Sequence, residues 1–124
     1  GVSDVPLGRS TIAAGEYIFR EGEEGNAAFL ILSGKVEVRR SLDAQEVVIA
    51  TAGPGSIIGE MALNDDEPRM ASVKTIAETE VTVIPAEELE VRIKRLEKFD
   101  PVMFRLMGMF VQRMRDYKII DVES

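Results

Sequence analysis

The sequence predicts a mainly β domain that ends in helices, and three observations lead to this fold class. The chain has 124 residues, which fits a single domain. Up to about residue 84, short β-prone runs alternate with turns, and glycines recur at positions 22, 25, 34, 53, 55 and 59. After that point, apolar residues recur at helical spacing. With 45% apolar and 30% charged residues, the composition is that of a globular domain.

Six strands are expected in the first part of the chain. The run "AAFLIL" is continuously apolar, which is typical of a buried strand. The run "KVEVRR" alternates instead, so Val36 and Val38 should point inward and the charged residues around them outward. The expected strands span residues 16–19, 27–32, 35–40, 46–51, 69–75 and 78–84. Many short strands with regular turns favour a sandwich or a jelly-roll barrel.

Two helices are expected after the strands. Pro85 suits the first position of a helix over "AEELEVRIKRLE". Asp100 is a favourable N-cap for a second helix, with Pro101 at its first position, that runs to about residue 118. The first helix has apolar residues at helical spacing, namely Leu89, Ile93 and Leu96.

The second helix carries apolar residues over a wide arc. One stripe consists of Met103, Met107, Phe110, Met114 and Tyr117, and a second stripe of Val102, Leu106 and Met109. A helix that is apolar over such an arc is covered on more than one side. One side can pack on the strands, and the other side needs a ligand, a partner helix or another part of the chain.

The composition excludes several classes of function. The chain contains no cysteine and no histidine. This removes disulfides, thiolate zinc sites, cysteine nucleophiles and histidine-based catalysis. A jelly-roll enzyme of the cupin type usually needs histidine ligands for its metal, so we expect neither an enzyme nor a bound metal.

Charge and hydropathy restrict the partners. The net charge is −7, and the acidic first part should repel nucleic acid, whose binding depends on phosphate charge. The mildly basic segment 90–118 is better interpreted as a solvated helical face. No run of 18 apolar residues occurs, so no membrane-spanning helix is expected. The absence of cysteine fits a cytoplasmic setting.

The segment "GEMALNDDEPRMASV" has the strongest chemical pattern. Gly59 permits a tight transition from a strand into a single helical turn, whose free N–H groups attract anions. Arg69 offers a planar fork of donors suited to phosphate, and Glu60, which only accepts hydrogen bonds, suits a sugar hydroxyl. These residues predict a ribose-phosphate clamp, which backbone N–H groups of Met70 and Ala71 could complete. The alternative is a plain ion pair between Arg69 and Glu60.

This segment, residues 59–73, resembles the phosphate-binding cassette of cyclic-nucleotide-binding domains. The family occurs in the regulatory subunits of cAMP-dependent protein kinase, in catabolite activator proteins and in cyclic-nucleotide-gated channels. A second motif, "IFREGEEGNAAFLILSGKVEV" (18–38), resembles the family's strand, acidic glycine turn and apolar strand. Glu23 stands where the family usually has Asp. The turn "AGPGSIIGE" also matches, and the resemblance extends over about residues 12–120.

The resemblance implies an eight-stranded antiparallel jelly-roll β-barrel with a short phosphate-binding helix, followed by B and C helices. The barrel would span about residues 12–84 and the helices about residues 85–119, with residues 1–11 as an N-terminal segment. No DNA-binding, kinase or channel module follows the C helix in the sequence. We therefore expect either a stand-alone sensor or a domain of a longer protein.

The same resemblance implies a role for each matching residue. Glu60 would bind the ribose 2′-hydroxyl and Arg69 the cyclic phosphate, while the nonpolar Met70 favours cAMP over cGMP. The remaining cassette contacts would come from Gly59, Met61, Ala62 and Ala71. The base pocket would be lined by Val38, Ile49, Ile58 and Val73, for which plain barrel core is at least as good an interpretation. Candidates for a lid over the base are Met114, Tyr117 and Lys118, whose helix could instead be core or a dimer seam.

The expected function is a regulatory sensor that binds a small-molecule cyclic nucleotide and moves its C-terminal helix. This helix could also join two copies in a homodimer, and the output domain or partner protein is unknown. The main alternative is a ligand-free structural or dimerisation module of the same fold. The intact pair of Glu60 and Arg69 favours the sensor.

Overall fold

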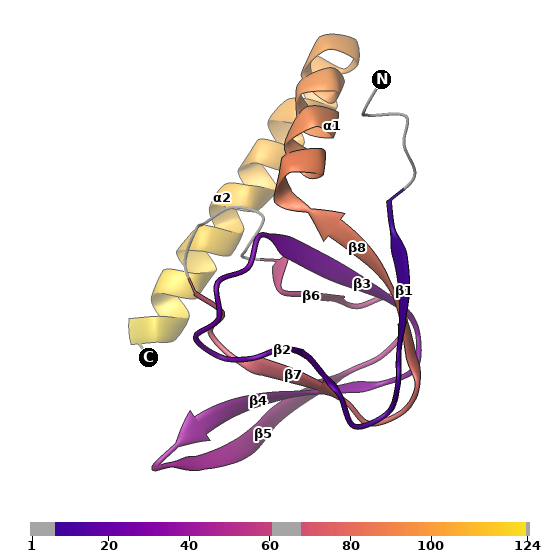
Figure 1. Ribbon diagram of the computed structural model, residues 1–124. Coiled ribbons are helices and arrows are strands. Elements are labelled where there is room, and N and C mark those ends of the chain that lie inside the picture. The colour runs from indigo at the N-terminus through magenta and orange to yellow at the C-terminus, as the bar shows by residue number, and fades with distance from the viewer. Residues whose placement is uncertain (1–6, 61–67, 124) are drawn as a thin grey trace.

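Eight strands and two helices make up the described part of the chain (Figure 1). The computed structural model describes residues 7–60 and 68–123, without the side chains of residues 111, 114, 115 and 117–123. The strands are β1 (Arg9–Ile12), β2 (Tyr17–Phe19), β3 (Ala27–Ser33), β4 (Val36–Leu42), β5 (Gln45–Ala52), β6 (Ile57–Ile58), β7 (Ser72–Thr75) and β8 (Thr79–Pro85). The helices are α1 (Ala86–Phe99) and α2 (Pro101–Glu123).

The strands form two antiparallel sheets of four strands each. The strand order is β1-β8-β3-β6 in one sheet and β2-β7-β4-β5 in the other. Successive strands therefore alternate between the sheets, except for β4 and β5, which form a hairpin. These connections are those of a jelly roll, so the predicted fold class is confirmed.

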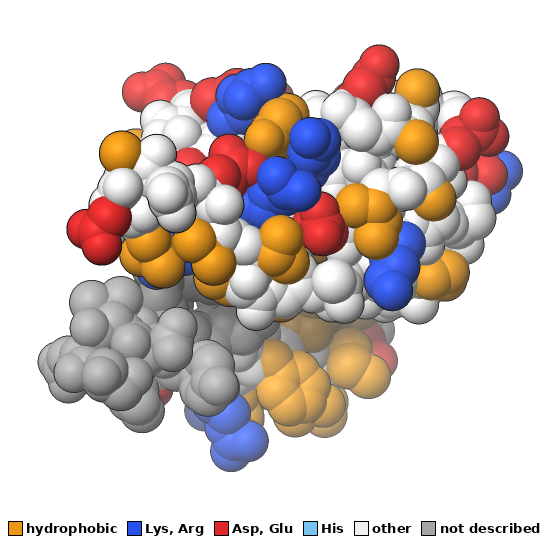
Figure 2. Space-filling model, turned by 90° about the horizontal axis from the view of Figure 1, so that it is seen from below, with side chains coloured by type: hydrophobic (Ala, Val, Ile, Leu, Met, Phe, Trp, Pro, Cys, Tyr) orange, Lys and Arg blue, Asp and Glu red, His pale blue; other side chains and the backbone are white. Residues whose placement is uncertain are grey.

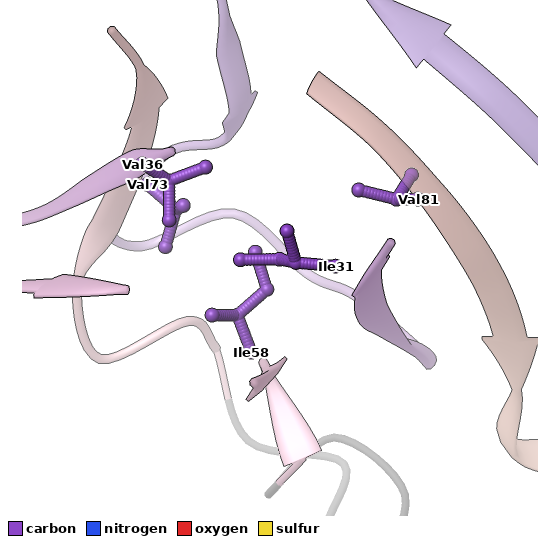
Figure 3. Packing of buried hydrophobic residues seen from close by; sticks show 5 residues of the cluster. All are labelled: Ile31, Val36, Ile58, Val73 and Val81. Atoms are coloured by element: carbon purple, nitrogen blue, oxygen red, sulfur yellow. The ribbon is translucent and has the colours of Figure 1, made fainter. Parts of the chain in front are cut away.

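The hydrophobic core lies between the two sheets, and five strands contribute to it (Figure 3). Its buried members are Ile31, Val36, Ile58, Val73 and Val81. Burying an aliphatic side chain of this size contributes roughly 1.5–3 kcal/mol of hydrophobic stabilisation. The alternation predicted for β4 is confirmed, because Val36 is fully buried and Val38 packs against the same cluster.

The outer face of the β2-β7-β4-β5 sheet carries paired charges. Figure 2 views the molecule from this side and shows acidic, basic and hydrophobic side chains interspersed. Arg39 bridges Glu37 at 2.6 Å and Glu46 at 3.2 Å. Tyr17 donates its hydroxyl to the same Glu46 carboxylate at 2.6 Å. This network ties β2 to the β4–β5 hairpin across the surface of the sheet.

Two strands escaped the sequence-based prediction. β1 has the sequence RSTI, which shows no apolar alternation, and it exists because it pairs with β8 from Arg9 to Ile12. β6 contains only two residues, too few for a period to be recognised. The first strand thus begins at Arg9, within the range 1–11 that the sequence assigned to an N-terminal segment.

The β4–β5 hairpin contains two local irregularities. Its turn consists of Asp43 and Ala44, which have φ angles of 50° and 64°. Two positive φ values in a two-residue loop are typical of a type I′ turn, a position that favours glycine or asparagine. Further along β5, Ile49 has no partner in β4 and forms a β-bulge.

The helices begin close to the predicted positions. Pro85 ends β8 and occupies the N-cap position of α1, with φ −66° and ψ 141°, so the prediction that it is the first helical residue is wrong by one position. The predicted cap of α2 is confirmed, because Met103 donates its N–H to Asp100 Oδ1 at 3.1 Å. α1 packs against β8 and α2. Its half-buried apolar residues include the predicted Leu89, Ile93 and Leu96.

α2 runs back along α1 (Figure 1), and many of its apolar side chains are exposed. Phe104 and Met107 are half-buried. Five other apolar side chains are between 39% and 79% exposed, namely Val102, Met103, Leu106, Met109 and Phe110. These five residues come from both predicted stripes, so over residues 102–110 each stripe is largely exposed in a single chain. Within the described ranges, neither helix is long and apolar enough to cross a membrane.

Candidate functional site

Arg69 is fixed to the turn after β2 by its own backbone. Its N–H donates to the carbonyl of Glu23 at 2.8 Å, and its carbonyl accepts from the N–H of Gly22 at 2.8 Å. This bridge lies just before β7 and brings residues that are far apart in sequence side by side. The side chain consequently enters the interior, where Arg69 is only 8% exposed.

The guanidinium of Arg69 binds two backbone carbonyls. Nη2 donates to the oxygen of Ala27 at 2.8 Å, and Nη1 donates to the oxygen of Gly59 at 3.3 Å. The third nitrogen, Nε, is buried and has no hydrogen-bond partner among residues 7–60 and 68–123. Because an unpaired buried donor costs about 1–3 kcal/mol, this nitrogen marks a place where an acceptor would be favourable.

Two aromatic rings lie beside the same guanidinium. The carbon Cζ of Arg69 is 4.1 Å from the centre of the Phe19 ring and 5.9 Å from the centre of the Phe29 ring. The two ring centres are 6.0 Å apart. A cation this close to an aromatic face is attracted by about 0.5–2 kcal/mol, and Phe19 is the nearer ring.

Two glycines make room for the guanidinium. A Cβ at Gly25 would overlap Nε, Nη2 and Cζ of Arg69. A Cβ at Gly59 would lie 2.5 Å from Nη1 and 3.0 Å from the ring of Phe19. Gly59 also has a φ angle of 70°, a left-handed conformation that other residues seldom adopt. Both positions therefore need a residue without a side chain.

The electrostatics of Arg69 differ from those of a surface arginine. Burial lowers the pKa of Arg69 from its ordinary value, and the charge of Glu23 opposes this effect. Among residues 7–60 and 68–123, no carboxylate forms an ion pair with Arg69. The alternative of a plain Arg69–Glu60 ion pair is thus absent from the structure. The site is a buried cation held mainly by neutral groups.

The other predicted cassette residues are adjacent in sequence to Gly59 or close to Arg69 along the chain. Glu60 directly follows Gly59 and is half-buried, and Ala71 is half-buried just before β7. Met70 is 39% exposed. Met61, Ala62 and the short helix expected over them lie outside the described residues. The structure therefore places Gly59 against Arg69 by a direct hydrogen bond, and the ligand contacts of the others stay predictions.

The four predicted base-pocket residues do not form one cluster in the structure. Ile58 and Val73 belong to the buried core, and Val38 packs against it as the cross-strand partner of Val73. Ile49 is 51% exposed at the bulge in β5, apart from this cluster. A role in binding the base remains a prediction for each. The lid candidates Met114, Tyr117 and Lys118 lie on α2, and their side chains are outside the described residues.

Sequence reasoning missed three contributors to the site. Phe19 was assigned to a strand, Gly25 to a turn, and Ala27 to a buried strand. Gly25 offered one signal, because it is the second glycine of the turn "GEEG", where a single glycine would suffice to reverse the chain. The carbonyl of Ala27 had no recognisable signal, since every residue carries one. The described residues contain no group of three acidic side chains close enough to bind a metal.

Comparison with known sequences agrees with the family resemblance of residues 59–73. A family profile described as "Cyclic nucleotide-binding domain" matches residues 9–95. The "Cyclic AMP receptor protein" of Thermus thermophilus is 36% identical over 103 residues, which cover 82% of this chain and 46% of that protein. The "cGMP-dependent protein kinase 2" of Mus musculus is 35% identical over 104 residues, covering 82% of this chain and 13% of the kinase. The chain thus spans about half the length of the first relative.

Comparison with solved structures agrees with the fold. The half-site-occupied form of EAL enzyme Bd1971 has a TM-score of 0.80 and 28% identity, covering 90% of this chain and 98% of that chain. The same enzyme was solved in a cAMP-bound form and in a cGMP-bound form, each with a TM-score of 0.69 and covering 30% of that enzyme's chain. These two forms match 93% and 94% of this chain, at 29% and 28% identity.

Proposed function

Since the chain belongs to the cyclic nucleotide-binding domain family, we propose that it is a regulatory sensor that binds cAMP in preference to cGMP. It would bind its ligand without chemical change and report it through its C-terminal helix. The chain offers no histidine or cysteine for catalysis. One of the two relatives is named for cAMP and the other for cGMP. The preference for one of these ligands must therefore be argued from residues of this chain.

The observation that carries the proposal is the buried guanidinium of Arg69. A buried charge without a partner of opposite charge is costly. The side chain nevertheless stays inside, and its buried Nε has no partner in the part of the chain that the structure describes. A phosphate oxygen matches the guanidinium fork in both charge and geometry. Arg69 would therefore bind the cyclic phosphate, with Nε as one of the donors.

The neighbouring Glu60 supports a ribose beside the phosphate. It is one residue from Gly59, whose carbonyl accepts from Arg69 Nη1. A carboxylate cannot bind a phosphate favourably, but it accepts strong hydrogen bonds from hydroxyl groups. The Glu60 carboxylate would accept a hydrogen bond from the ribose 2′-hydroxyl. Backbone N–H groups at Met61, Ala62 and Ala71 would complete the cradle.

Met70 is the basis for the preference for cAMP. Its side chain follows Arg69 directly and is 39% exposed. A thioether is a poor partner for the amino group of guanine, whereas a hydroxyl at this position could bind it. We expect Met70→Thr to raise the affinity for cGMP relative to cAMP. A ratio that does not change would remove Met70 from this role.

α2 is the proposed responding element. Its open apolar side can cover the base of a bound nucleotide through Met114, Tyr117 and Lys118, or pack against α2 of a second copy. α2 exposes five apolar side chains, which fits packing against α2 of a second copy. Sedimentation of the wild type and of the Leu106→Glu variant tests it, since a dimer through this side should dissociate in the variant.

Isothermal titration of the purified chain with cAMP, cGMP and AMP tests the proposed function. We expect cAMP to bind one per chain and more tightly than cGMP. AMP, which carries a noncyclic phosphate, is the control for simple charge attraction. If no cyclic nucleotide binds at millimolar concentration, the chain is instead a ligand-free structural or dimerisation module of this fold.

A further inference from the structure

We propose that Phe19 and Gly25 are positioning residues that hold the guanidinium of Arg69 ready for an anionic ligand. The inference rests on the proposed phosphate-binding role of Arg69. It assigns a binding function to two residues that need not touch the ligand. The guanidinium depends on Phe19 for an aromatic face and on Gly25 for empty space.

Gly25 is needed for space and not for its backbone conformation. Five other glycines in the described residues have positive φ angles, and Gly25 is not among them. An alanine could therefore adopt the same backbone without strain. Its Cβ, however, would overlap three atoms of the Arg69 guanidinium, including Cζ at 2.5 Å. The missing side chain at this position serves Arg69.

Phe19 contributes the closest aromatic contact. Its ring centre is 4.1 Å from Cζ of Arg69, whereas the ring of Phe29 is 5.9 Å away. Both rings are half-buried and pack against the same core cluster. The difference in distance makes Phe29 a matched control, because its loss should affect the core similarly and Arg69 less.

The groups around the Arg69 guanidinium fix its orientation, and with it the direction of its other N–H donors. The carbonyls of Ala27 and Gly59 hold Nη2 and Nη1, and the ring of Phe19 and the backbone of Gly25 restrict the plane of the group. A free arginine side chain has large rotamer entropy, and a binding group fixed in advance loses less of it when the ligand binds. Phe19 and Gly25 would therefore raise affinity for cAMP through Arg69.

Gly25→Ala is the first test, with Gly8→Ala as its control. A Cβ at Gly8 meets nothing within 4 Å, and this residue also lacks a positive φ. We expect Gly25→Ala to raise the dissociation constant for cAMP about tenfold, or ~1.4 kcal/mol, and Gly8→Ala to leave it within twofold. Equal affinity of Gly25→Ala and wild type would overturn the role of Gly25.

Phe19→Leu, Phe19→Tyr and Phe29→Leu form the second test. Leucine keeps an apolar side chain but removes the ring, and tyrosine restores the ring. We expect several-fold weaker binding of cAMP by Phe19→Leu, near-normal binding by Phe19→Tyr, and a smaller loss for Phe29→Leu. Equal losses in Phe19→Leu and Phe29→Leu would show that the aromatic ring acts only through the core.

A double-mutant cycle separates positioning from a general structural effect. In an Arg69→Ala background, Gly25→Ala and Phe19→Leu should each change the affinity for cAMP by less than twofold, since no guanidinium remains to be held. Losses as large as in the wild-type background would overturn the inference. If Arg69→Ala itself binds cAMP normally, the phosphate role fails instead, so the two failures are distinguishable.

Discussion

Ala86, the first residue of α1, donates its backbone N–H to the carbonyl oxygen of Asn26 at 2.6 Å. The next carbonyl along the chain, that of Ala27, accepts a hydrogen bond from Arg69. α1 has no side-chain cap at this end, where Pro85 is the N-cap residue. The start of the helix is therefore held by a peptide group adjacent to the one that holds Arg69. A ligand bound to Arg69 would therefore be connected to α1 through these two carbonyls.

The first prediction is that cAMP slows amide exchange in both helices. The proposed response to the ligand requires that the helices can pack in two ways. The ligand shifts the equilibrium between the two packings only by its differential affinity for them. Gly108 within α2 lowers local helix stability by about 1 kcal/mol relative to alanine, and methionines such as Met107 and Met109 can re-pack on different surfaces. Hydrogen exchange should slow at Ala86 and across residues 109–118 when cAMP is added.

Truncation before Gln112 provides the complementary measurement. It removes the lid candidates and should raise the dissociation constant for cAMP, while circular dichroism shows that the strands remain folded. Identical exchange with and without saturating cAMP would mean that α2 is docked permanently and does not sense the ligand.

The second prediction concerns Arg69→Ala. Hydrogen bonds to a charged group are worth about 1.5–3 kcal/mol, which corresponds to a loss of affinity of about tenfold to over a hundredfold. The fold should survive, because the variant also removes a costly buried cation. Titration calorimetry with cAMP measures the loss, and circular dichroism is the control. Unchanged affinity in a natively folded variant would place the phosphate elsewhere.

The third prediction concerns the ribose. Glu60→Gln keeps an acceptor oxygen but loses the charge that strengthens its bond to a hydroxyl. It should weaken cAMP binding, though less than Arg69→Ala does. The matching chemical control is 2′-deoxy-cAMP with the unmodified protein. If cAMP and its 2′-deoxy analogue bind equally well, Glu60 does not contact the 2′-hydroxyl.

The fourth prediction is that Ala44→Gly stabilises the protein. Ala44 has a φ angle of 64° in the β4–β5 turn, a conformation that costs an L-residue roughly 1–2 kcal/mol. Glycine removes that strain but is more flexible when unfolded, so we expect a net gain of about 0.5–1 kcal/mol. Ala50→Gly, within the paired part of β5, is the control and should destabilise. Thermal unfolding of both variants measures whether each substitution raises or lowers the stability of the protein.

The fifth prediction is a shifted titration of Tyr17. Its hydrogen bond to Glu46, followed by desolvation and the charge of Glu46, raises the pKa of Tyr17 above 10.0. The contribution of this bond to stability is therefore present below pH 10 and is lost as pH rises through the folded pKa. The pKa of Glu46 is lowered from 4.5, chiefly by the same bond, so the contribution is also lost as pH falls through that lowered value.

Ultraviolet absorbance of tyrosinate measures the shift. The chain has two tyrosines, so a Tyr117→Phe background leaves Tyr17 as the reporter. Glu46→Ala in that background should lower the pKa of Tyr17 toward 10.0. A pKa that is the same with and without Glu46 would contradict the hydrogen bond.

Local patterns predicted most of the fold. Alternation at Val36 and Val38, the apolar run of β3 and the cap at Asp100 each depend on residues a few positions apart, and each is confirmed. β1 could not be predicted in this way, because its pairing with β8 joins residues about 70 positions apart. The bulge at Ile49 depends on the register between β4 and β5, which periodicity does not determine.

The candidate site was predictable in its chemistry but not in its support. The pattern from Gly59 to Arg69 contains the residue types that a phosphate and a sugar require. The inward position of the guanidinium depends on Phe19, Gly25 and the carbonyl of Ala27, which come from a segment more than 40 residues earlier. Such support arises from tertiary packing, and an aromatic residue or a glycine alone does not indicate it.

The bulge at Ile49 also affects how the protein behaves at high concentration. β5 is the outermost strand of its sheet, and Val47, Val48 and Ile49 are between 38% and 51% exposed along it. The strand contains neither lysine nor proline, the residues that commonly prevent such an edge from templating aggregation. A bulge bends the strand and interrupts its row of backbone donors and acceptors. The bulge at Ile49 should thus make this exposed edge a poor template for joining the sheets of neighbouring molecules into fibrils.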